Sequence, residues 1–266
     1  RAMGWEVRGT SRDAGALRDL EAEGISGSSL EDAEIPPGTS HILSTIPPEE
    51  AGDPVLRHHA NAIAAADGLV WLGYLSTTGV YGDRGGEWVD ESDAPAPGNA
   101  RSLRRLAAEE AWRDLGRDAG VPVQIFRLAG IYGPGRNVLE SVRAGTAKRI
   151  DKPGHVFSRI HVDDIVQTLL AAMARPGANA TYNVCDDEPA EPAAVVAHAC
   201  SLLGVEPPTV EKFDAGAMSA MAQSFWAENR RVWNSRIKRE LGVSLRYPDY
   251  RAGLAALLAE SPGKFK

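Results

Sequence analysis

Apolar residues along the chain occur either in short unbroken runs or with the spacing of a helix face. The runs begin at His41, Trp71 and Val121, and unbroken runs of this kind are typical of strands buried on both faces of a parallel sheet. A shorter strand is expected at residues 5–10. Because strand and helix patterns alternate from there to about residue 135, the sequence predicts an α/β fold with a doubly wound parallel sheet.

The helical patterns carry start and stop signals. At residues 53–68, Asp53 stands where an N-cap is needed, Pro54 takes the first helical position and Gly68 ends the pattern. Asp163 is expected to cap a later helix. The helix at residues 100–120 is expected to bury an apolar stripe made of Leu103, Leu106, Ala107, Ala111 and Leu115.

Composition narrows the class of protein. A net charge of -7 over 266 residues argues against a nucleic-acid partner or an anionic membrane surface, because phosphate binding needs a basic face. No apolar run approaches the ~20 residues of a membrane span. Two cysteines, Cys185 and Cys200, are too few for a disulfide framework or a cysteine metal site, and the histidines form no short-spaced ligand pair. We expect a cytoplasmic protein without a metal.

Six blocks of the sequence stand in the order of a known family: STTGVYGD, AAEEAW, FRLAGIYGPG, RIHVDDI, TYNVCDDEP and RRVWNSRIKRELG. Together they resemble the extended short-chain dehydrogenase/reductase family, the NAD(P)-dependent epimerase/dehydratase group. The resemblance implies a Rossmann-type dinucleotide-binding domain at residues 1–135 with a return segment at about 155–190. Residues 136–154 and 191–266 are then expected to form a small α/β substrate-binding lobe.

The same resemblance implies an element ahead of Arg1. The family has its first strand and a Gly-x-x-Gly-x-x-Gly turn before the point where this sequence starts, and those glycines let the backbone approach a pyrophosphate. A strand, turn and helix of that kind take roughly two dozen residues. We therefore expect this segment to precede Arg1, and no glycine of the turn can be named here.

The type of cofactor is predicted from the end of the strand at residues 5–10. An acidic residue there suits the ribose hydroxyls of NAD, whereas a cation and hydroxyl groups suit the 2′-phosphate of NADP. Thr10, Ser11 and Arg12 occupy this place and favour NADP over NAD. The alternative is that Arg12 is a solvated turn residue. Four other residues are expected near the cofactor, namely Ser44 and Thr45, which are equally well explained as strand-end hydroxyls, and Leu128 and Ala129 beside the nicotinamide.

The catalytic residues of the family are only partly present. Counting back from Tyr81 in STTGVYGD places Thr77 at the hydroxyl that steadies the substrate oxygen. A Tyr-x-x-x-Lys pair should follow on the next long helix, but counting back from Glu109 gives Arg101 at the tyrosine position and Arg105 at the lysine position. Arginine keeps its proton at neutral pH, so Arg101 cannot move one.

Two interpretations of this arginine pair stay open. Arg105 could donate to the nicotinamide ribose while Arg101 holds an anionic group of the substrate. Alternatively, both are surface arginines that pair with Glu109 or with nearby acids.

Other residues could then transfer the proton or bind the substrate. Tyr81, Tyr132 and His161 are candidates for proton transfer, although each is better explained by packing. Arg127 and Arg159 are candidates for anion contacts, because an arginine in a buried strand needs a partner. The sequence thus predicts an NADP-binding, atypical oxidoreductase or epimerase that acts on a small polar or sugar-like molecule. An inactive NAD(P)-binding sensor is the alternative, and whether a homodimer forms is left open.

Overall fold

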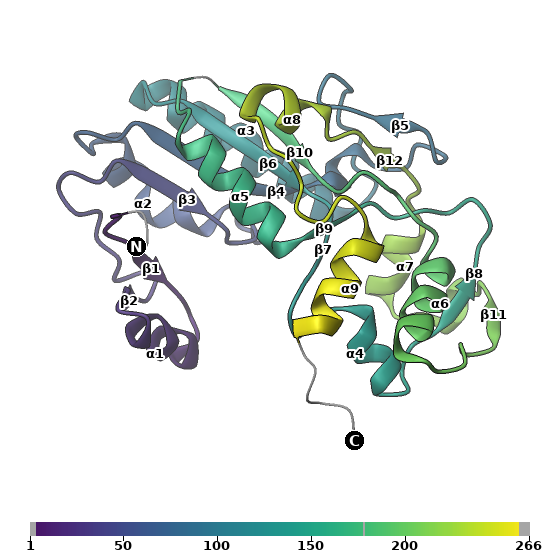
Figure 1. Cartoon of the computed structure of the whole chain (residues 1–266). Coiled ribbons are helices and arrows are strands. Elements are labelled where there is room, and N and C mark those ends of the chain that lie inside the picture. The colour runs from purple at the N-terminus through teal and green to yellow at the C-terminus, as the bar shows by residue number, and fades with distance from the viewer. Residues whose placement is uncertain (1–3, 178, 261–266) are drawn as a thin grey trace.

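A four-stranded parallel sheet forms the centre of the molecule in the computed structural model, which describes residues 4–177 and 179–260 (Figure 1). Its strands, in spatial order, are β10 (Ala180–Val184), β6 (Val123–Leu128), β4 (Trp71–Thr77) and β3 (His41–Ser44). Every residue of β6 is buried, as expected for a central strand covered on both faces. The predicted α/β fold with a parallel sheet is confirmed.

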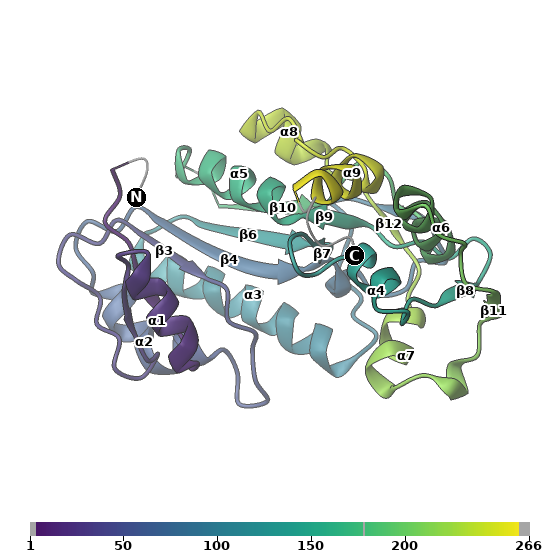
Figure 2. The same cartoon turned by 60° about the horizontal axis from the view of Figure 1, so that its bottom comes forward.

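Helices cover both faces of this sheet. Figure 2 shows α2 (Pro54–Ala64) and α3 (Ala100–Ala119) on one face, and α5 (Val162–Met173) and α8 (Ser235–Leu241) on the other. The start of α2 is as predicted, since the Asp53 carboxylate accepts a hydrogen bond from the Leu56 amide at 3.1 Å and Pro54 is the first helical residue.

Two helix predictions were wrong in detail. The cap of α5 is His161 rather than Asp163: its ring nitrogen Nδ1 accepts from the Asp163 amide at 3.2 Å, because β9 (Arg159–His161) runs directly into the helix. On α3, three members of the predicted stripe are exposed, namely Leu103 (54% exposed), Ala107 and Ala111, whereas Leu115 is buried. The buried face is rotated so that Glu109 and Trp112 point inward.

A small unit precedes the sheet in the chain. It consists of β1 (Arg8–Thr10), α1 (Ala14–Ala22) and β2 (Ser26–Ser28), with β1 and β2 parallel. Within the described residues, β1 pairs only with β2, and β3 pairs only with β4, so β1 and β3 each keep one edge without a strand. The strand expected ahead of Arg1 stays a prediction.

The remaining elements lie beyond the carboxyl ends of the central strands. The bounds of these elements are β7 (Gly130–Tyr132), α4 (Val138–Arg143), β8 (Arg149–Asp151), α6 (Pro192–Leu203), β11 (Val210–Lys212), η2 (Ala215–Ala217), α7 (Ala220–Trp226) and α9 (Tyr250–Glu260). They share a separate apolar core of α4, α6 and α9 that includes Leu139, Val195 and Leu254. Two short strands, β5 (Trp88–Val89) and β12 (Arg231–Val232), pair with each other, and η1 (Thr78–Tyr81) follows β4.

None of the helices in residues 4–177 and 179–260 is long and apolar enough to cross a membrane. The same part of the chain contains no group of three or more histidine, cysteine, aspartate or glutamate side chains that could hold a metal ion.

Candidate functional site

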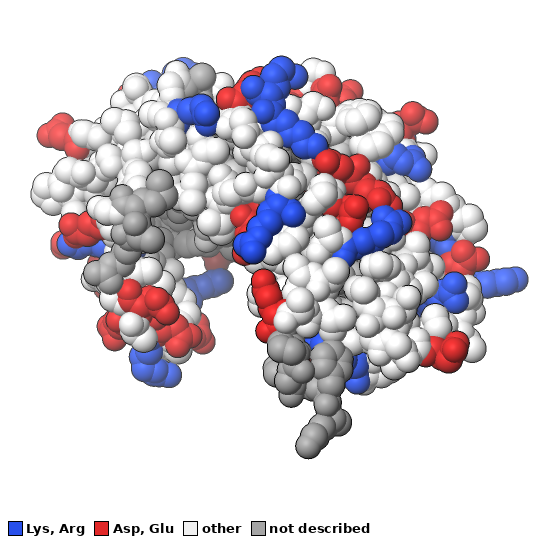
Figure 3. All heavy atoms as spheres, in the orientation of Figure 1, with Lys and Arg blue, Asp and Glu red and all other residues white. Residues whose placement is uncertain are grey.

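The carboxyl ends of parallel strands meet at one edge of a sheet, and ligands of open α/β sheets bind there. At this edge Ser44 ends β3 and Thr77 ends β4, while Arg12 follows β1 in the neighbouring unit. The Ser44 hydroxyl oxygen is buried and has no hydrogen-bond partner within the described residues. Figure 3 shows that the molecular surface is hollowed between the unit that carries α1 and the lobe that carries α9.

Arg12 keeps most of its guanidinium in solvent. Its side chain is 75% exposed, and its one ion pair with the described residues is a long contact of 3.4 Å from Nη1 to the Glu49 carboxylate. Glu49 also binds Arg57 at 2.8 Å. Asp13 caps α1 by accepting from the Ala16 amide at 2.7 Å. Arg12 is thus available to an anion at the end of β1, as an NADP site would require.

Thr77 links the sheet to η1. Its Oγ1 accepts a hydrogen bond from the Gly79 amide at 3.1 Å, so its hydroxyl proton is still available for another oxygen. Gly79 allows α3 to pack here, because a Cβ on this residue would lie 2.9 Å from the Ser102 hydroxyl and 3.3 Å from Thr77 Oγ1. The first turn of α3 therefore lies next to Thr77.

The two arginines of α3 point to different partners. Arg105 reaches the ends of the strands, where its Nη1 donates to the Leu75 carbonyl at 2.9 Å and to the Tyr74 hydroxyl at 3.0 Å. Arg101 instead places its guanidinium carbon 4.6 Å from the centre of the Phe225 ring on α7. Within the described residues neither arginine has a carboxylate partner, so the alternative of pairing with Glu109 is not found.

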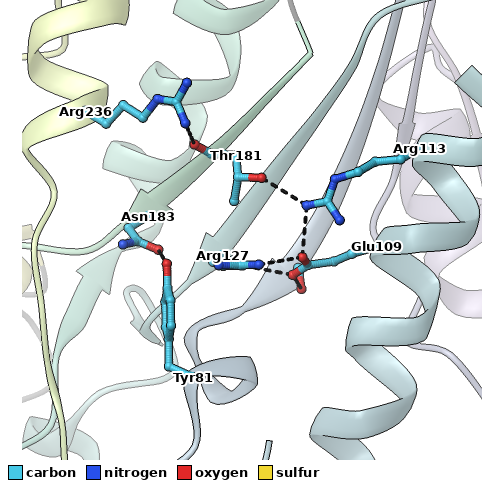
Figure 4. Close-up of polar contacts among 8 residues, drawn as sticks. Tyr81, Glu109, Arg113, Arg127, Thr181, Asn183 and Arg236 are labelled. Atoms are coloured by element: carbon cyan, nitrogen blue, oxygen red, sulfur yellow. Dashed lines mark hydrogen bonds and ion pairs between the residues drawn. The ribbon is translucent and has the colours of Figure 1, made fainter. Parts of the chain in front are cut away.

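Glu109 occupies the centre of a buried polar network (Figure 4). Its fully buried carboxylate accepts from Arg127 at 3.1 Å and 2.8 Å, and from the Ser76 hydroxyl at 2.6 Å. Arg113 adds a contact at 3.2 Å and also donates to the Thr181 hydroxyl at 3.0 Å. Arg127, expected to meet an anion of the substrate, is 4% exposed and meets this internal carboxylate.

The phenol of Tyr81 is also used inside the protein. Its hydroxyl donates to the Asn183 side-chain oxygen at 2.9 Å (Figure 4), and its ring lies 4.8 Å from the Arg127 guanidinium carbon. Burial raises the pKa of Tyr81 above its usual value. A fully buried phenol with a raised pKa is poorly suited to exchange a proton with a substrate.

Tyr132, His161 and Arg159 lie together at the ends of β7 and β9. The Tyr132 and His161 rings meet edge to face at 5.2 Å, and burial raises the pKa of Tyr132 and lowers that of His161. Arg159 donates to the carbonyls of Phe157 at 2.8 Å and Ala190 at 3.1 Å. Thr10, Ser11, Thr45, Leu128 and Ala129 end or follow their strands, as expected.

The sequence analysis missed Asp186, which belongs to the same cluster. It lies beyond the end of β10, is 1% exposed, and neither carboxylate oxygen has a hydrogen-bond partner in the described residues. Burial raises its pKa to about 8, although the Arg159 charge acts in the opposite direction. The only sequence signal was an aspartate directly after a buried strand.

The helix α7 approaches α3 from the lobe and is anchored by one side chain. The Trp226 ring stacks on His155 at 5.1 Å and lies 5.3 Å from Phe213, while the Lys152 ammonium donates to the Trp226 carbonyl at 2.6 Å. The next segment contacts α3, because the Asn99 side chain donates to Glu228 at 2.9 Å. Phe225 is thereby held over the first turn of α3.

The anchor of α7 is expected to weaken in acid. Burial, with Lys152 nearby, lowers the pKa of His155 from 6.5 to about 4. Between these pH values the native state binds fewer protons than the unfolded state, so the free energy of unfolding should fall as the pH falls, by on the order of 2 kcal/mol. Urea unfolding at roughly pH 7 and pH 4.5, the two ends of this window, measures the change in the free energy of unfolding. His155→Phe should flatten this dependence, whereas a change at the exposed His58 should not; equal slopes in wild type and His155→Phe would contradict the assignment.

Comparisons with known proteins agree with this architecture. Residues 57–185 match the model of the NAD dependent epimerase/dehydratase family. A structure of a functionally unknown conserved protein from Silicibacter pomeroyi DSS is 47% identical with a TM-score of 0.92, over 97% of this chain and 92% of that one. Protein YeeZ of Escherichia coli K12 is 27% identical, over 93% of this chain and 90% of its own length.

A more distant structure shows the same fold. MoeE5, solved in complex with UDP-glucuronic acid and NAD, is 17% identical with a TM-score of 0.75, over 98% of this chain and all (100%) of that one. The resemblance inferred from the six sequence blocks and the Rossmann-type fold are both confirmed. The chain belongs to the NAD dependent epimerase/dehydratase family.

Proposed function

We propose that the protein binds NADP at the carboxyl edge of its sheet and acts there on a small polar or sugar-like molecule, as an oxidoreductase or an epimerase. The observation that carries the proposal is the free guanidinium of Arg12 at the end of β1, 75% exposed and only loosely paired with Glu49. The fold supports a nicotinamide cofactor, because MoeE5, which has the same fold, was solved with NAD.

The residues present suit a nucleotide cofactor. The buried Ser44 hydroxyl at the end of β3 has no hydrogen-bond partner in the part of the chain that the structure describes, and a ligand oxygen at this edge would supply one. Glu49 contacts both Arg12 and Arg57, and one carboxylate can neutralise only one of these two guanidinium charges. Because MoeE5 holds NAD, the preference for NADP rests on Arg12 and Ser11.

On the substrate side, Thr77 would orient the reacting oxygen. Its hydroxyl already accepts from Gly79 and therefore has its proton to donate. Arg105, which reaches the ends of β3 and β4, would lie beside the cofactor ribose. When bound, the nicotinamide supplies or accepts the hydride.

A second candidate function is a cofactor-binding sensor without catalysis. It is favoured by the arginines at both positions of the proton-transferring pair and by the internal hydrogen bond of Tyr81. The two functions share the cofactor site and differ in turnover.

Replacing Arg12 is expected to change cofactor choice. A charged hydrogen bond contributes about 1.5–3 kcal/mol, so Arg12→Gln should weaken NADPH binding roughly tenfold to a hundredfold and leave NADH binding unchanged. Fluorescence titration of both cofactors measures the two affinities. Arg18→Gln, which removes an exposed charge from the neighbouring α1, is the matched control.

An equal loss for NADPH and NADH, or no loss for either, would remove the support for NADP. The wild-type chain is then mixed with NADPH and a panel of aldehydes, keto acids and sugar nucleotides. Oxidation of NADPH by any of them supports the enzyme, and tight binding without turnover supports the sensor.

A further inference from the structure

The first two turns of α3 carry three guanidinium groups that have no carboxylate partner. Arg101, Arg104 and Arg105 make no ion pair in residues 4–177 and 179–260, whereas Arg113 and Arg117, farther along the same helix, pair with Glu109 at 3.2 Å and with Asp114 at 2.9 Å. The contrast shows that the arginines of this helix are neutralised at one end only.

The three unpaired arginines lie near the N-terminus of α3, where positive charge is unfavourable. The N-terminus of a helix already carries the positive end of its dipole, and like charges four residues apart repel each other. In a helix of 20 residues that begins at Ala100, Arg101 stands in the first turn, where an anion would be stabilised, and Arg104 and Arg105 follow in the second turn. A bound anion would relieve both effects.

The donors of these arginines are also largely unused. Arg101 lies over the Phe225 ring, and no hydrogen bond from its guanidinium is found within the described residues. The Nε of Arg104 is buried and has no hydrogen-bond partner among residues 4–177 and 179–260. Within the described residues Arg105 donates hydrogen bonds through Nη1 alone, and its guanidinium carbon lies 5.6 Å from the centre of the Tyr74 ring. Arg101 and Arg104, three residues apart, share one side of the helix.

The cluster borders the candidate site. Ser102 lies between Arg101 and Arg104 in the chain, and its hydroxyl packs against Gly79, whose amide donates to Thr77. An anion held by this turn would therefore be bound on the helix that packs against the segment carrying Thr77.

We infer that the substrate carries a carboxylate or phosphate that Arg101 and Arg104 bind, while Thr77 holds its reacting oxygen. The inference rests on the proposed function and specifies its substrate class. The position that the family uses for proton transfer then serves to bind an anion. Phe225 holds the guanidinium in place without using its donors, which would make the site selective for planar or tetrahedral oxyanions that accept two hydrogen bonds.

Titration of the full chain with inorganic phosphate and with acetate, at constant ionic strength, tests this inference. In wild type either anion should raise the melting temperature. Arg101→Gln should weaken the binding of that anion at least tenfold, and Arg104→Gln should weaken it as well. Arg117→Gln removes the same charge from the paired end of α3, and its effect should stay within about twofold.

Three outcomes would overturn the inference: no binding of either anion, equal losses in Arg101→Gln and Arg117→Gln, or a tenfold loss of NADPH affinity in Arg101→Gln. The last would identify the cofactor phosphate as the anion. Failure of the proposed function has a different signature, since wild type would then not bind NADPH at all.

Discussion

Glu109→Gln is expected to lower the free energy of unfolding by about 3–5 kcal/mol, because it leaves the buried Arg127 charge without a counter-charge. The carboxylate is fully buried and accepts four hydrogen bonds, two of them from Arg127 (Figure 4). A glutamine of the same shape can accept at one oxygen only, and its amide hydrogens would face a guanidinium. Urea unfolding followed by circular dichroism measures the difference.

The control for this experiment is Glu110→Gln, which removes the same charge from the adjacent, exposed position of α3. Its effect should stay within about 0.5 kcal/mol. Replacing Glu109 and Arg127 together by methionine should recover much of the loss, since a buried ion pair can often be exchanged for apolar groups. If the double variant were no more stable than Glu109→Gln, packing rather than the unpaired charge would explain the loss.

Gly82→Ala is expected to destabilise the fold by roughly 3 kcal/mol or more, since it combines backbone strain with a clash. Gly82 has φ 69° and ψ -158°, a conformation that is essentially confined to glycine. A Cβ at this position would lie 1.9 Å from the Ala96 carbonyl oxygen. Thermal and urea unfolding of the purified variant check the size of the effect.

Gly85→Ala is the matched control. Gly85 also has a positive φ, of 60°, but no atom lies within 4 Å of a Cβ built there. Its substitution should cost about 1 kcal/mol, the value of the backbone strain alone. Equal losses in the two variants would contradict the close contact between Gly82 and the Ala96 carbonyl oxygen.

Glu109 and Gly82 both stabilise the segment that carries Thr77. Glu109 connects α3 to Ser76 and Arg127 of the sheet, and Gly82 ends η1, which Thr77 begins. The surroundings of Thr77 are thus held by buried, rigid contacts. Arg101 and Phe225, by contrast, lie on the surface and come from two different parts of the molecule. A binding group that is held by buried contacts, as the Thr77 hydroxyl is here, is well oriented for a ligand.

Several features of this protein follow from the sequence by itself. The buried strands, their parallel order and the limits of α2 depend on neighbouring residues: unbroken apolar runs, and the Asp53 cap followed by Pro54. The arginines at the two positions of the proton-transferring pair could also be located by counting within one helix. In each case the information lies within a few residues of the feature.

Only the tertiary structure decided which polar groups are used internally. Arg127 is bound by Glu109, and Tyr81 by Asn183, 102 residues farther along the chain. Asp186 is buried with no hydrogen-bond partner in the described residues, and Arg101 lies against Phe225 of the distant α7. Burial and pairing depend on which segments the fold brings together, and local sequence patterns do not specify those long-range contacts.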